Sequence, residues 1–365
     1  MIPFYDGRRV LADRRDELLG AVARVIDSGV LILGPEVEAF EAEFAARVGT
    51  REGVGVASGT DALLLALRAL DVGPGDEVIT VSNAGVPTIA AIRLVGAVPR
   101  FVDVDSDRLL LEPTGLEAAL NERTRAVIPV HLYGQAVDLD PVLAFARAHD
   151  LRVIEDCAQA LGARPGGRQV GGRGDAGCFS FYPTKNLGGL GDAGFVATDD
   201  AAVAERVRAL RMYGFDAARR ARIEGLNSRL DEVQAAVLRV RLPHLEAELE
   251  ERRALAQRYR EGLQGTPHRT LSGTGDDAHA HHLMVVLSPD RERSRAALDA
   301  AAIGSAVHYP VPVHRMEAYA FLGLAEGTLP ATEQACRSVL SLPLHPGLEP
   351  ADIDRVIDVL NGAFA

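Results

Sequence analysis

Short apolar runs alternate with helical patterns of apolar and polar positions between Glu52 and about Val240. The runs VGVAS, DEVITVS and RAVIPVHLYG each precede a segment with helical spacing, namely TDALLLALRAL, PTIAAIRLVG and PVLAFARAH. The strand candidates LRVIED and GCFSFY follow them. Because this order is typical of β-α units stacked around one sheet, we predict an α/β fold with a mostly parallel central sheet.

The pattern changes near Leu242 and Pro243, where a long charged helix candidate begins, HLEAELEERRALAQRYREGL. Beyond it lie the strand candidates HHLMVVL and GSAVHYP and the helix candidates SRAALDAA and DIDRVIDVLN. A chain of 365 residues also exceeds the usual length of one domain. We therefore predict a large α/β domain over residues 1–242 and a small α+β domain over residues 243–365, with the N-terminal segment as a candidate to pack on the small domain.

A hydrophobic content of 47% with 25% charged residues is ordinary for a folded globular protein. The net charge of -12 argues against nucleic acid or an anionic membrane as a partner, since both need a basic surface.

The chain has three cysteines, Cys157, Cys178 and Cys336, and their odd number and wide spacing favour reduced thiols. The start MIPFYDGRRV lacks the apolar core of a signal peptide, and no apolar run nears the ~20 residues of a membrane span. We expect a cytoplasmic enzyme.

Two ionisable residues stand at the ends of strand candidates. Asp156 ends LRVIED, and ligands of open α/β sheets bind beyond the carboxyl ends of strands, although a capping or turn aspartate is an equally good interpretation. Lys185 lies in FSFYPTKNLGGLGDAG, between an apolar strand and a glycine-rich loop. Most lysines are merely solvated, but a desolvated lysine forms Schiff bases with carbonyl cofactors. Together the two residues indicate pyridoxal phosphate, whose pyridine nitrogen a carboxylate keeps protonated.

The segment SGTDAL places a glycine between a strand candidate and a helix candidate. The first N–H groups of such a helix could hold a phosphate. Taken alone, Ser58, Gly59 and Thr60 favour a simple helix cap. Their position ahead of Asp156 and Lys185 shifts the balance towards a phosphate site.

These segments resemble the DegT/StrS-type sugar aminotransferases, which have the pyridoxal-phosphate fold called type I, the fold of aspartate aminotransferase. The likeness spans nearly the whole chain and rests on GPEVEAFEAEFA, ASGTDAL, GDEVIT, PVHLYGQ, IEDCAQALGA, FSFYPTKNLGGLGDAG, IEGLNSRLDEVQAAVL, AHHLMVV, VHYPVPVH and SLPLHP. In this order the segments are highly specific. The resemblance implies a pyridoxal-phosphate-dependent sugar aminotransferase that works as a homodimer.

The resemblance also implies a role for each matching residue. Lys185 would carry the cofactor and move protons, and Asp156 would partner the pyridine nitrogen. The remaining cofactor contacts would be Gln159 at the phenolic oxygen, with Gly59, Thr60 and Ser180 of one subunit and Asn227 of the other subunit at the phosphate.

One segment departs from the family pattern. The family usually places an aromatic side chain after the GDEVIT strand, where it stacks on the cofactor ring. Here the segment reads SNAGVPTIAA, so that Gly85 takes the aromatic position, with Val86 and Pro87 beside it. Two explanations stay open: a smaller apolar contact replaces the ring, or another segment supplies one.

In the implied reaction L-glutamate gives its amino group to the cofactor, and a nucleotide-linked keto-sugar then receives it. The segment AVHYPVPVH most resembles relatives that aminate C3 of a nucleotide-linked keto-deoxysugar, such as a dTDP-3-keto-6-deoxyhexose, in deoxyaminosugar biosynthesis for antibiotics or surface glycans. We predict His308, Tyr309 and His314 as substrate contacts. The alternative is that His308 and His314 are loop or packing residues.

Other functions stay open as alternatives. The enzyme could aminate C4 of a sugar or a cyclitol, or it could be a pyridoxal-phosphate sugar dehydratase. The presence of Lys185 and the want of a cysteine cluster argue against the dehydratase. A regulator that binds the cofactor or a sugar without turnover is the least favoured. An appended helix-turn-helix domain would favour it, but the sequence begins almost directly with the segment that resembles the family's own N-terminus.

Two further groups of residues are not assigned to the site. Arginines near Asn227 suit a diphosphate, but for Arg219, Arg220 and Arg222 a solvated basic loop is at least as good an interpretation. Three histidines invite a zinc interpretation, namely His279, His281 and His282. We predict no metal site, because neighbours on a strand point to opposite faces and no cysteine or carboxylate cluster accompanies them.

Overall fold

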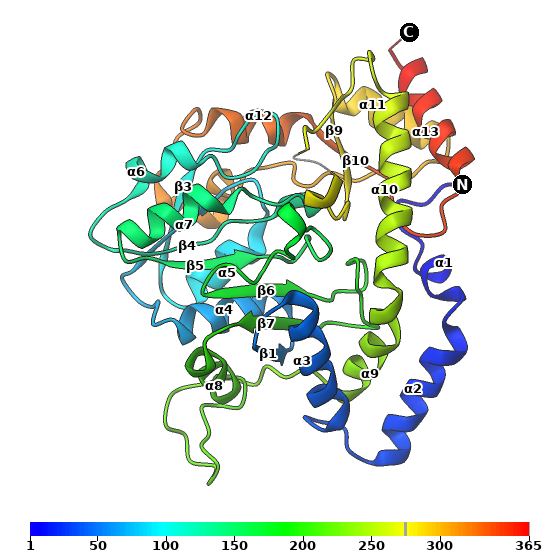
Figure 1. Ribbon diagram of the computed structural model, residues 1–365. Coiled ribbons are helices and arrows are strands. Elements are labelled where there is room, and N and C mark those ends of the chain that lie inside the picture. Colours follow the sequence, from blue (N-terminus) through cyan, green and yellow to red (C-terminus); the bar gives the residue numbers. More distant parts are fainter. Residues whose placement is uncertain (274–275, 365) are drawn as a thin grey trace.

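The computed structural model describes residues 1–273 and 276–364. Its central sheet has seven strands in the order β1-β7-β6-β5-β4-β2-β3 (Figure 1). Neighbouring strands are parallel from β6 to β3, and β7 is antiparallel to both of its neighbours. The predicted α/β fold with a mostly parallel sheet is confirmed. The strands are β1 Glu52–Val56, β2 Glu77–Val81, β3 Val98–Val102, β4 Thr124–Val127, β5 Arg152–Asp156, β6 Ala176–Ser180 and β7 Gly194–Thr198.

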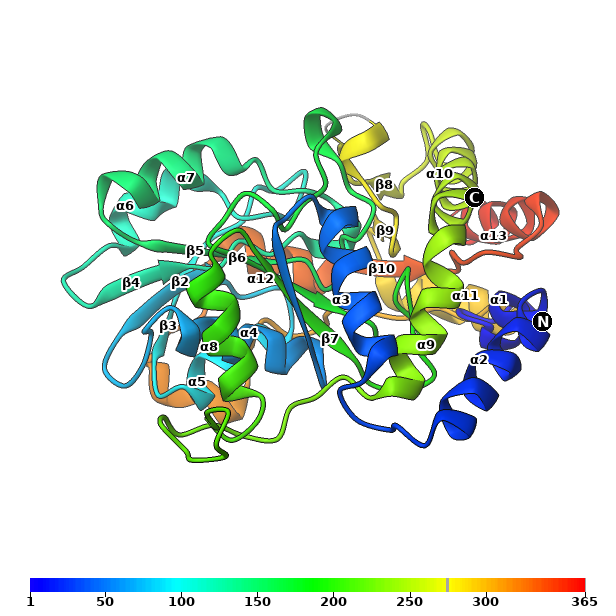
Figure 2. The ribbon, with the colours of Figure 1, turned by 60° about the horizontal axis from the view of Figure 1, so that its bottom comes forward.

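Helices cover both faces of this sheet. Helix α4 packs between α5 and α8 on one face, while α6 and α7 lie on the other (Figure 2). No described helix is both long and apolar enough to cross a membrane. The helices are α1 Gly7–Ala12, α2 Arg15–Ser28, α3 Pro35–Val48, α4 Gly59–Ala69, α5 Val86–Leu94, α6 Leu116–Ala119, α7 Leu139–Ala148, α8 Ala201–Leu210, α9 Glu232–Arg241, α10 Leu245–Gly262, α11 Arg291–Ala300, α12 Pro330–Ser338 and α13 Pro350–Gly362.

Burial on both faces explains the apolar runs in the sequence. Every residue of β2 and of β7 is buried, so these strands read as continuous runs rather than as an alternation of apolar and polar positions. Helix α4 is also buried along most of its length, through Leu63, Leu65 and Leu67 among others. The sheet therefore forms a rigid base for the loops at the carboxyl ends of its strands.

The C-terminal part of the chain holds a second, antiparallel sheet in the order β10-β9-β8, made of Val339–Leu342, Met284–Leu287 and Arg269–Thr270. A separate core lies between this sheet and helices α10 and α13, around Tyr259. The N-terminal segment joins it, because Ile2 exchanges backbone hydrogen bonds with Ala302 (3.0 Å) and Gly304 (2.8 Å). The division into domains at residue 242 stays a prediction.

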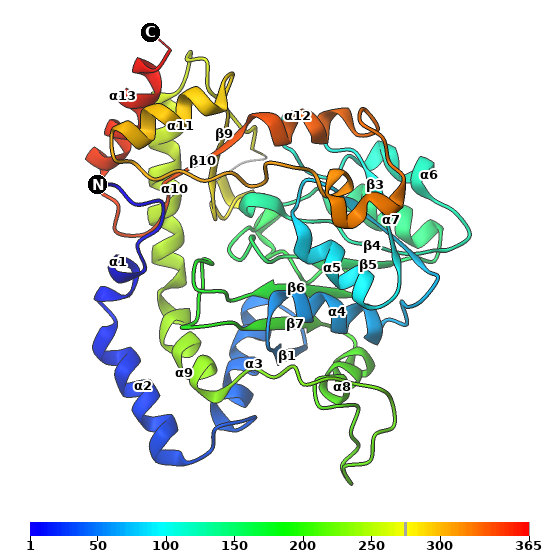
Figure 3. The same ribbon diagram turned by 180° about the vertical axis from the view of Figure 1, so that it is seen from behind.

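Helix α12 extends from the C-terminal part across to the large sheet (Figure 3). The carboxylate of Asp103, just after β3, accepts the N–H groups of Ala331 (2.9 Å) and Thr332 (2.8 Å) in the first turn of α12. The chain before α12 is held as well, since the Val313 N–H donates to the Ser82 carbonyl (2.9 Å) just after β2. These contacts bring residues 308–314 to the carboxyl edge of the large sheet.

Candidate active site

Lys185 lies in the loop that follows β6, and hydrogen bonds hold this loop in place. Its backbone N–H donates to the Tyr182 carbonyl at 2.8 Å, which forms a turn around the lysine. The buried side-chain amide of Asn186 donates to the carbonyls of Leu161 (3.2 Å) and Ala280 (2.9 Å). The loop is thereby anchored to the segment after β5 and to the segment before β9, and the direction of Lys185 is set by both.

Lys185 is the only lysine in the chain, where 39 residues are lysine or arginine. Its side chain keeps some exposed surface, but protein surrounds it. Burial penalises the ammonium form and lowers the pKa of Lys185 to about 8, although the negative charge of Asp156 acts in the opposite direction. The lowered pKa leaves part of the amine neutral near neutral pH, which suits an amine that attacks a carbonyl and transfers protons.

Asp156 ends β5 and is only 5% exposed. Its two carboxylate oxygens each accept one hydrogen bond, from the Thr88 hydroxyl (2.7 Å) and from the Ala158 N–H (3.1 Å). Both hydrogen bonds fix the position of the carboxylate group. A buried anion with lone pairs to spare can accept a further donor, such as a protonated pyridine nitrogen.

The N-terminus of α4 lies beside the end of β6. The Ser58 hydroxyl caps this helix by accepting the Asp61 N–H at 3.1 Å. In the described part of the chain, the N–H groups of Gly59 and Thr60 have no protein acceptor. A Cβ atom on Gly59 would lie 2.7 Å from the Ser180 Cβ, so the glycine permits this close approach. Two free N–H groups at the positive end of a helix, with hydroxyls beside them, fit a phosphate.

Gln159 connects the segment after β5 to the C-terminal part. Its side-chain oxygen accepts the Tyr133 N–H at 2.7 Å, and its amide nitrogen lies 3.4 Å from the Tyr309 hydroxyl. The Tyr133 hydroxyl in turn donates to the His308 carbonyl at 2.5 Å. Gln159 is therefore held with its amide group directed towards Tyr309.

His308 and Tyr309 line a cavity of about 240 Å³ together with Lys185 and Gln159. Burial lowers the pKa of His308 to about 4, and the nearby Lys185 acts in the same direction. The imidazole is thus neutral at neutral pH, with its Nδ1 atom 2.9 Å from the Ser341 hydroxyl. The structure brings two of the three expected substrate residues to Lys185.

The structure places His314 elsewhere. Its imidazole is 2% exposed, and its ring nitrogens lie 2.8 Å from the Ser82 hydroxyl and 3.3 Å from the Glu333 carboxylate. It does not line the Lys185 cavity. Its side chain joins the C-terminal part to the end of β2, which is the packing role weighed as the alternative.

Seven residues that line the cavity were not predicted, among them Phe4, Tyr5 and His282. Phe4 stacks on His308 with ring centroids 5.8 Å apart, and the Tyr5 hydroxyl donates to the Pro183 carbonyl at 2.8 Å. Both come from the extreme N-terminus, where no local pattern marks them. His282 also lines the cavity, although the sequence suggested it only as a metal ligand. The sequence does carry one further signal for Lys185 itself, because it is the only lysine in the chain.

Comparison with known proteins identifies the family of this chain. The sequence profile of the DegT/DnrJ/EryC1/StrS aminotransferase family matches residues 12–361. The chain belongs to this family. It is 48% identical over 360 residues to the dTDP-3-amino-3,4,6-trideoxy-alpha-D-glucose transaminase of Streptomyces venezuelae, covering 98% of this chain and 95% of that protein.

Solved structures agree with the fold. The structure of S. venezuelae DesV in complex with a ketimine intermediate has a TM-score of 0.97 and 46% identity, covering 100% of this chain and 99% of that one. The structure of NtdA from Bacillus subtilis with bound cofactor PMP has a TM-score of 0.93 and 30% identity, covering 99% and 85%. The expected fold type and the expected class, a pyridoxal-phosphate-dependent sugar aminotransferase, are confirmed.

The residues of this family member fit the cofactor. Lys185 offers an amine of lowered pKa, Asp156 offers a buried anion, and the free N–H groups of Gly59 and Thr60 offer a phosphate cradle beside Ser180. Asn227 differs, because its side chain is exposed and lies outside the Lys185 cavity. Its role at the partner's phosphate stays a prediction.

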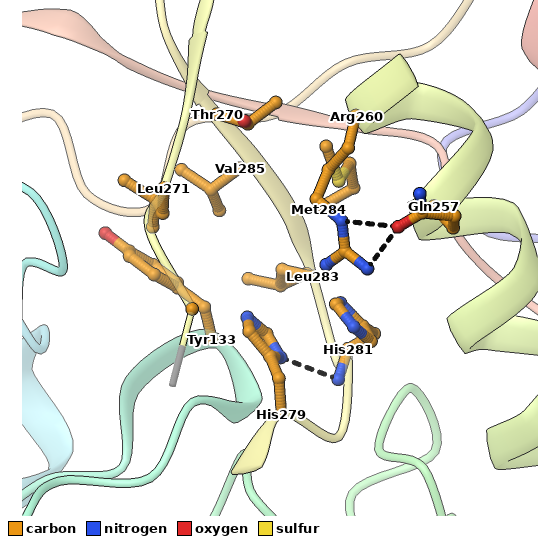
Figure 4. A pocket seen from close by; sticks show the side chains of 11 residues that line it. Tyr133, Gln257, Arg260, Thr270, Leu271, His279, His281, Leu283, Met284 and Val285 are labelled. Carbon is orange, nitrogen blue, oxygen red and sulfur yellow. Dashed lines mark hydrogen bonds between the residues drawn. The ribbon is translucent and has the colours of Figure 1, made fainter. Parts of the chain in front are cut away.

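A second cavity of about 270 Å³ lies beyond Leu283 and is lined by two of the three histidines that suggested zinc (Figure 4). The rings of His279 and His281 stack with centroids 4.0 Å apart at 7°. The argument that neighbouring histidines point to opposite faces is therefore wrong for this pair. The His281 N–H donates to His279 Nδ1 at 2.9 Å, so that nitrogen has no lone pair free for a metal.

Among the described residues one group has ligand atoms close enough for a metal, His131 with Glu155 and Cys157. His131 Nδ1 accepts the Val137 N–H at 2.9 Å, so its other nitrogen carries the proton and donates to Glu155 at 3.1 Å. Glu155 also accepts backbone N–H groups, including that of Gly171 at 2.7 Å. Hydrogen bonds account for this cluster without a metal.

The pKa of Lys185 gives a direct prediction. In the cofactor-free protein, the rate at which an amine-reactive reagent modifies Lys185 should rise with pH around a midpoint of about 8, because only the neutral lysine amine reacts. In Asp156→Asn the midpoint should fall, because the anion that favours the ammonium form is gone. Peptide mass spectrometry measures the modification of Lys185, and the α-amino group is the only other primary amine in the chain.

Asp358→Asn, at an exposed position of α13, is the matched control and should keep the wild-type midpoint. A wild-type midpoint near the 10.5 of a solvated lysine, or an upward shift in Asp156→Asn, would contradict this view of the site.

Proposed function

We propose that this protein transfers the amino group of L-glutamate to C3 of a dTDP-linked 3-keto-6-deoxyhexose in deoxyaminosugar biosynthesis. The observation that carries the proposal is the single lysine, Lys185, beside the buried Asp156 and the free N-terminus of α4. Amination at C3 is supported by the 48% identity to a transaminase named for a 3-amino sugar.

Pyridoxal phosphate, when bound, supplies an electron sink for the negative charge that develops on the substrate carbon. Lys185 takes a proton from that carbon and returns one, and its pKa of about 8 lets its Nζ atom act as base and as acid near neutral pH. Asp156, held in place by Thr88 and the Ala158 N–H, would accept a hydrogen bond from the protonated ring nitrogen. Gly59, Thr60 and Ser180 would bind the phosphate.

The cavity contributes a contact for the sugar but little positive charge. His308 is neutral and offers a hydrogen-bonding nitrogen towards a sugar hydroxyl or carbonyl. Among the described residues that line this cavity, Lys185 alone has a cationic side chain other than imidazole. Arg220 and Arg222 are exposed and both pair with Asp216 at 2.9 Å. The cations for the carboxylates of glutamate and for the diphosphate must come from beyond the cavity walls of this chain.

A homodimer is the second part of the proposal. The α1–α2 region and the loop after Lys185 border an apolar groove of about 400 Å³, lined by Leu11, Leu18, Leu19 and Leu190. Two of its large apolar side chains are exposed, Leu19 by 53% and Leu190 by 50%, and Ile26, farther along α2, is 67% exposed. Apolar surface of this kind favours a protein partner. A second copy seated here would close the Lys185 loop and could supply Asn227.

The donor half of the reaction is tested first. The purified protein loaded with pyridoxal phosphate should lose its near-visible absorption band on addition of L-glutamate and release one 2-oxoglutarate per site. Lys185→Ala should release at least 10³-fold less in the same time, because the group that moves the proton is absent. Asp358→Asn serves as the control and should behave as wild type. An unchanged band in the wild type would refute glutamate as the donor.

Mixed dimers test the origin of Asn227. Asn227→Ala and Lys185→Ala should each be inactive or nearly so as homodimers. If Asn227 serves the partner's site, a mixed dimer of the two variants contains one site with neither defect and recovers about half of the wild-type activity. If Asn227 serves its own site, both sites of the mixed dimer are defective and no activity returns. Differently tagged chains, co-expressed and purified through both tags, give the required species.

A further inference from the structure

Gly85 has no room for a side chain. It lies at the start of α5 with φ of +80°, a conformation that glycine adopts without strain. A Cβ atom at this position would lie 2.9 Å from two ring atoms of Tyr309 and 3.2 Å from a third. The Tyr309 ring therefore occupies the space into which a side chain at position 85 would project.

Tyr309 is held in this position from several sides. Its hydroxyl is 3.4 Å from the Gln159 amide nitrogen, and the preceding residue, His308, is fixed through its carbonyl by Tyr133 and through its ring by Ser341. The ring lies in the cavity that contains Lys185, and the charge of Asp156 is close enough to affect it. A rigid aromatic ring thus stands among the residues that fit pyridoxal phosphate.

The residues beside Gly85 do not offer a replacement. Val86 is 39% exposed, Pro87 is also exposed, and neither lines the Lys185 cavity. A planar aromatic cofactor binds best where an aromatic or apolar face covers it. Of the two explanations for the absent aromatic side chain, the structure favours the one in which a distant segment supplies the ring.

We propose that Tyr309 packs against the ring of pyridoxal phosphate and replaces an aromatic side chain at position 85. Gly85 and Tyr309 then form one unit, in which the glycine leaves the space that the tyrosine ring fills. This inference rests on the proposed use of the cofactor and changes the role of Tyr309 from a substrate contact to a cofactor-positioning residue.

Binding of pyridoxamine phosphate tests the proposal apart from catalysis, because this form cannot bond covalently to Lys185. Tyr309→Ala should bind it of the order of tenfold more weakly than wild type, while Tyr309→Phe, which keeps the ring, should stay within about twofold. Tyr309→Leu, which keeps apolar volume without the π face, should fall between them. Fluorescence or calorimetric titration gives the dissociation constants, and circular dichroism checks the fold of each variant.

The pairing with Gly85 is tested by a double-mutant cycle. Gly85→Ala should weaken binding in the wild-type background, because its Cβ displaces the ring and φ is unfavourable. In the Tyr309→Ala background the same change should weaken binding clearly less, since no ring remains to displace. If the effects of Gly85→Ala and Tyr309→Ala on binding add fully in the double variant, the proposed pairing of Gly85 with Tyr309 is wrong.

Two outcomes separate the possible failures. If the wild type binds pyridoxamine phosphate and Tyr309→Ala binds it equally well, while its KM for the keto-sugar rises, Tyr309 is a substrate contact and this inference is wrong. If the wild type itself does not bind pyridoxamine phosphate, the proposed function fails as a whole.

Discussion

The site depends on the close placement of one amine and one carboxylate at the ends of two adjacent parallel strands. Asp156 pairs with Cys178 between β5 and β6, and Lys185 follows from β6 through a short anchored loop. Burial lowers the pKa of Lys185 to about 8, and the negative charge of Asp156 opposes this shift. The Thr88 hydroxyl and the Ala158 N–H hold the carboxylate of Asp156 in place.

The features that could be predicted from sequence are those whose signals are local. Apolar runs buried on both sides predict the parallel sheet, and the positions of Asp156 and Lys185 after such runs place them at its carboxyl edge. Phe4 and Tyr5 could not be found in this way, because only the docking of the N-terminus on the C-terminal part brings them to the cavity. His314 stands in the same motif as His308, yet the chain direction turns its ring to Ser82 and Glu333. Proximity in sequence does not determine where a side chain points.

Two features link distant parts of the chain into one site. The Tyr309 ring lies over Gly85, so that the absence of a side chain in one segment and the presence of a ring in another are two sides of the same contact. The apolar groove beside the Lys185 loop and the scarcity of cations in the cavity both fit a site that a second subunit completes. A lysine of lowered pKa next to a buried carboxylate is typical of catalytic sites.

Amination at C3 is the central claim, and the position of the transferred nitrogen tests it most directly. The holoenzyme would be incubated with ¹⁵N-labelled L-glutamate and a dTDP-3-keto-6-deoxyhexose, with the corresponding 4-keto sugar offered in parallel. The account predicts that NMR spectra of the product show ¹⁵N bonded to C3, and that the 4-keto sugar stays unlabelled. Label at C4, or no label in either sugar while glutamate is still consumed, would contradict it.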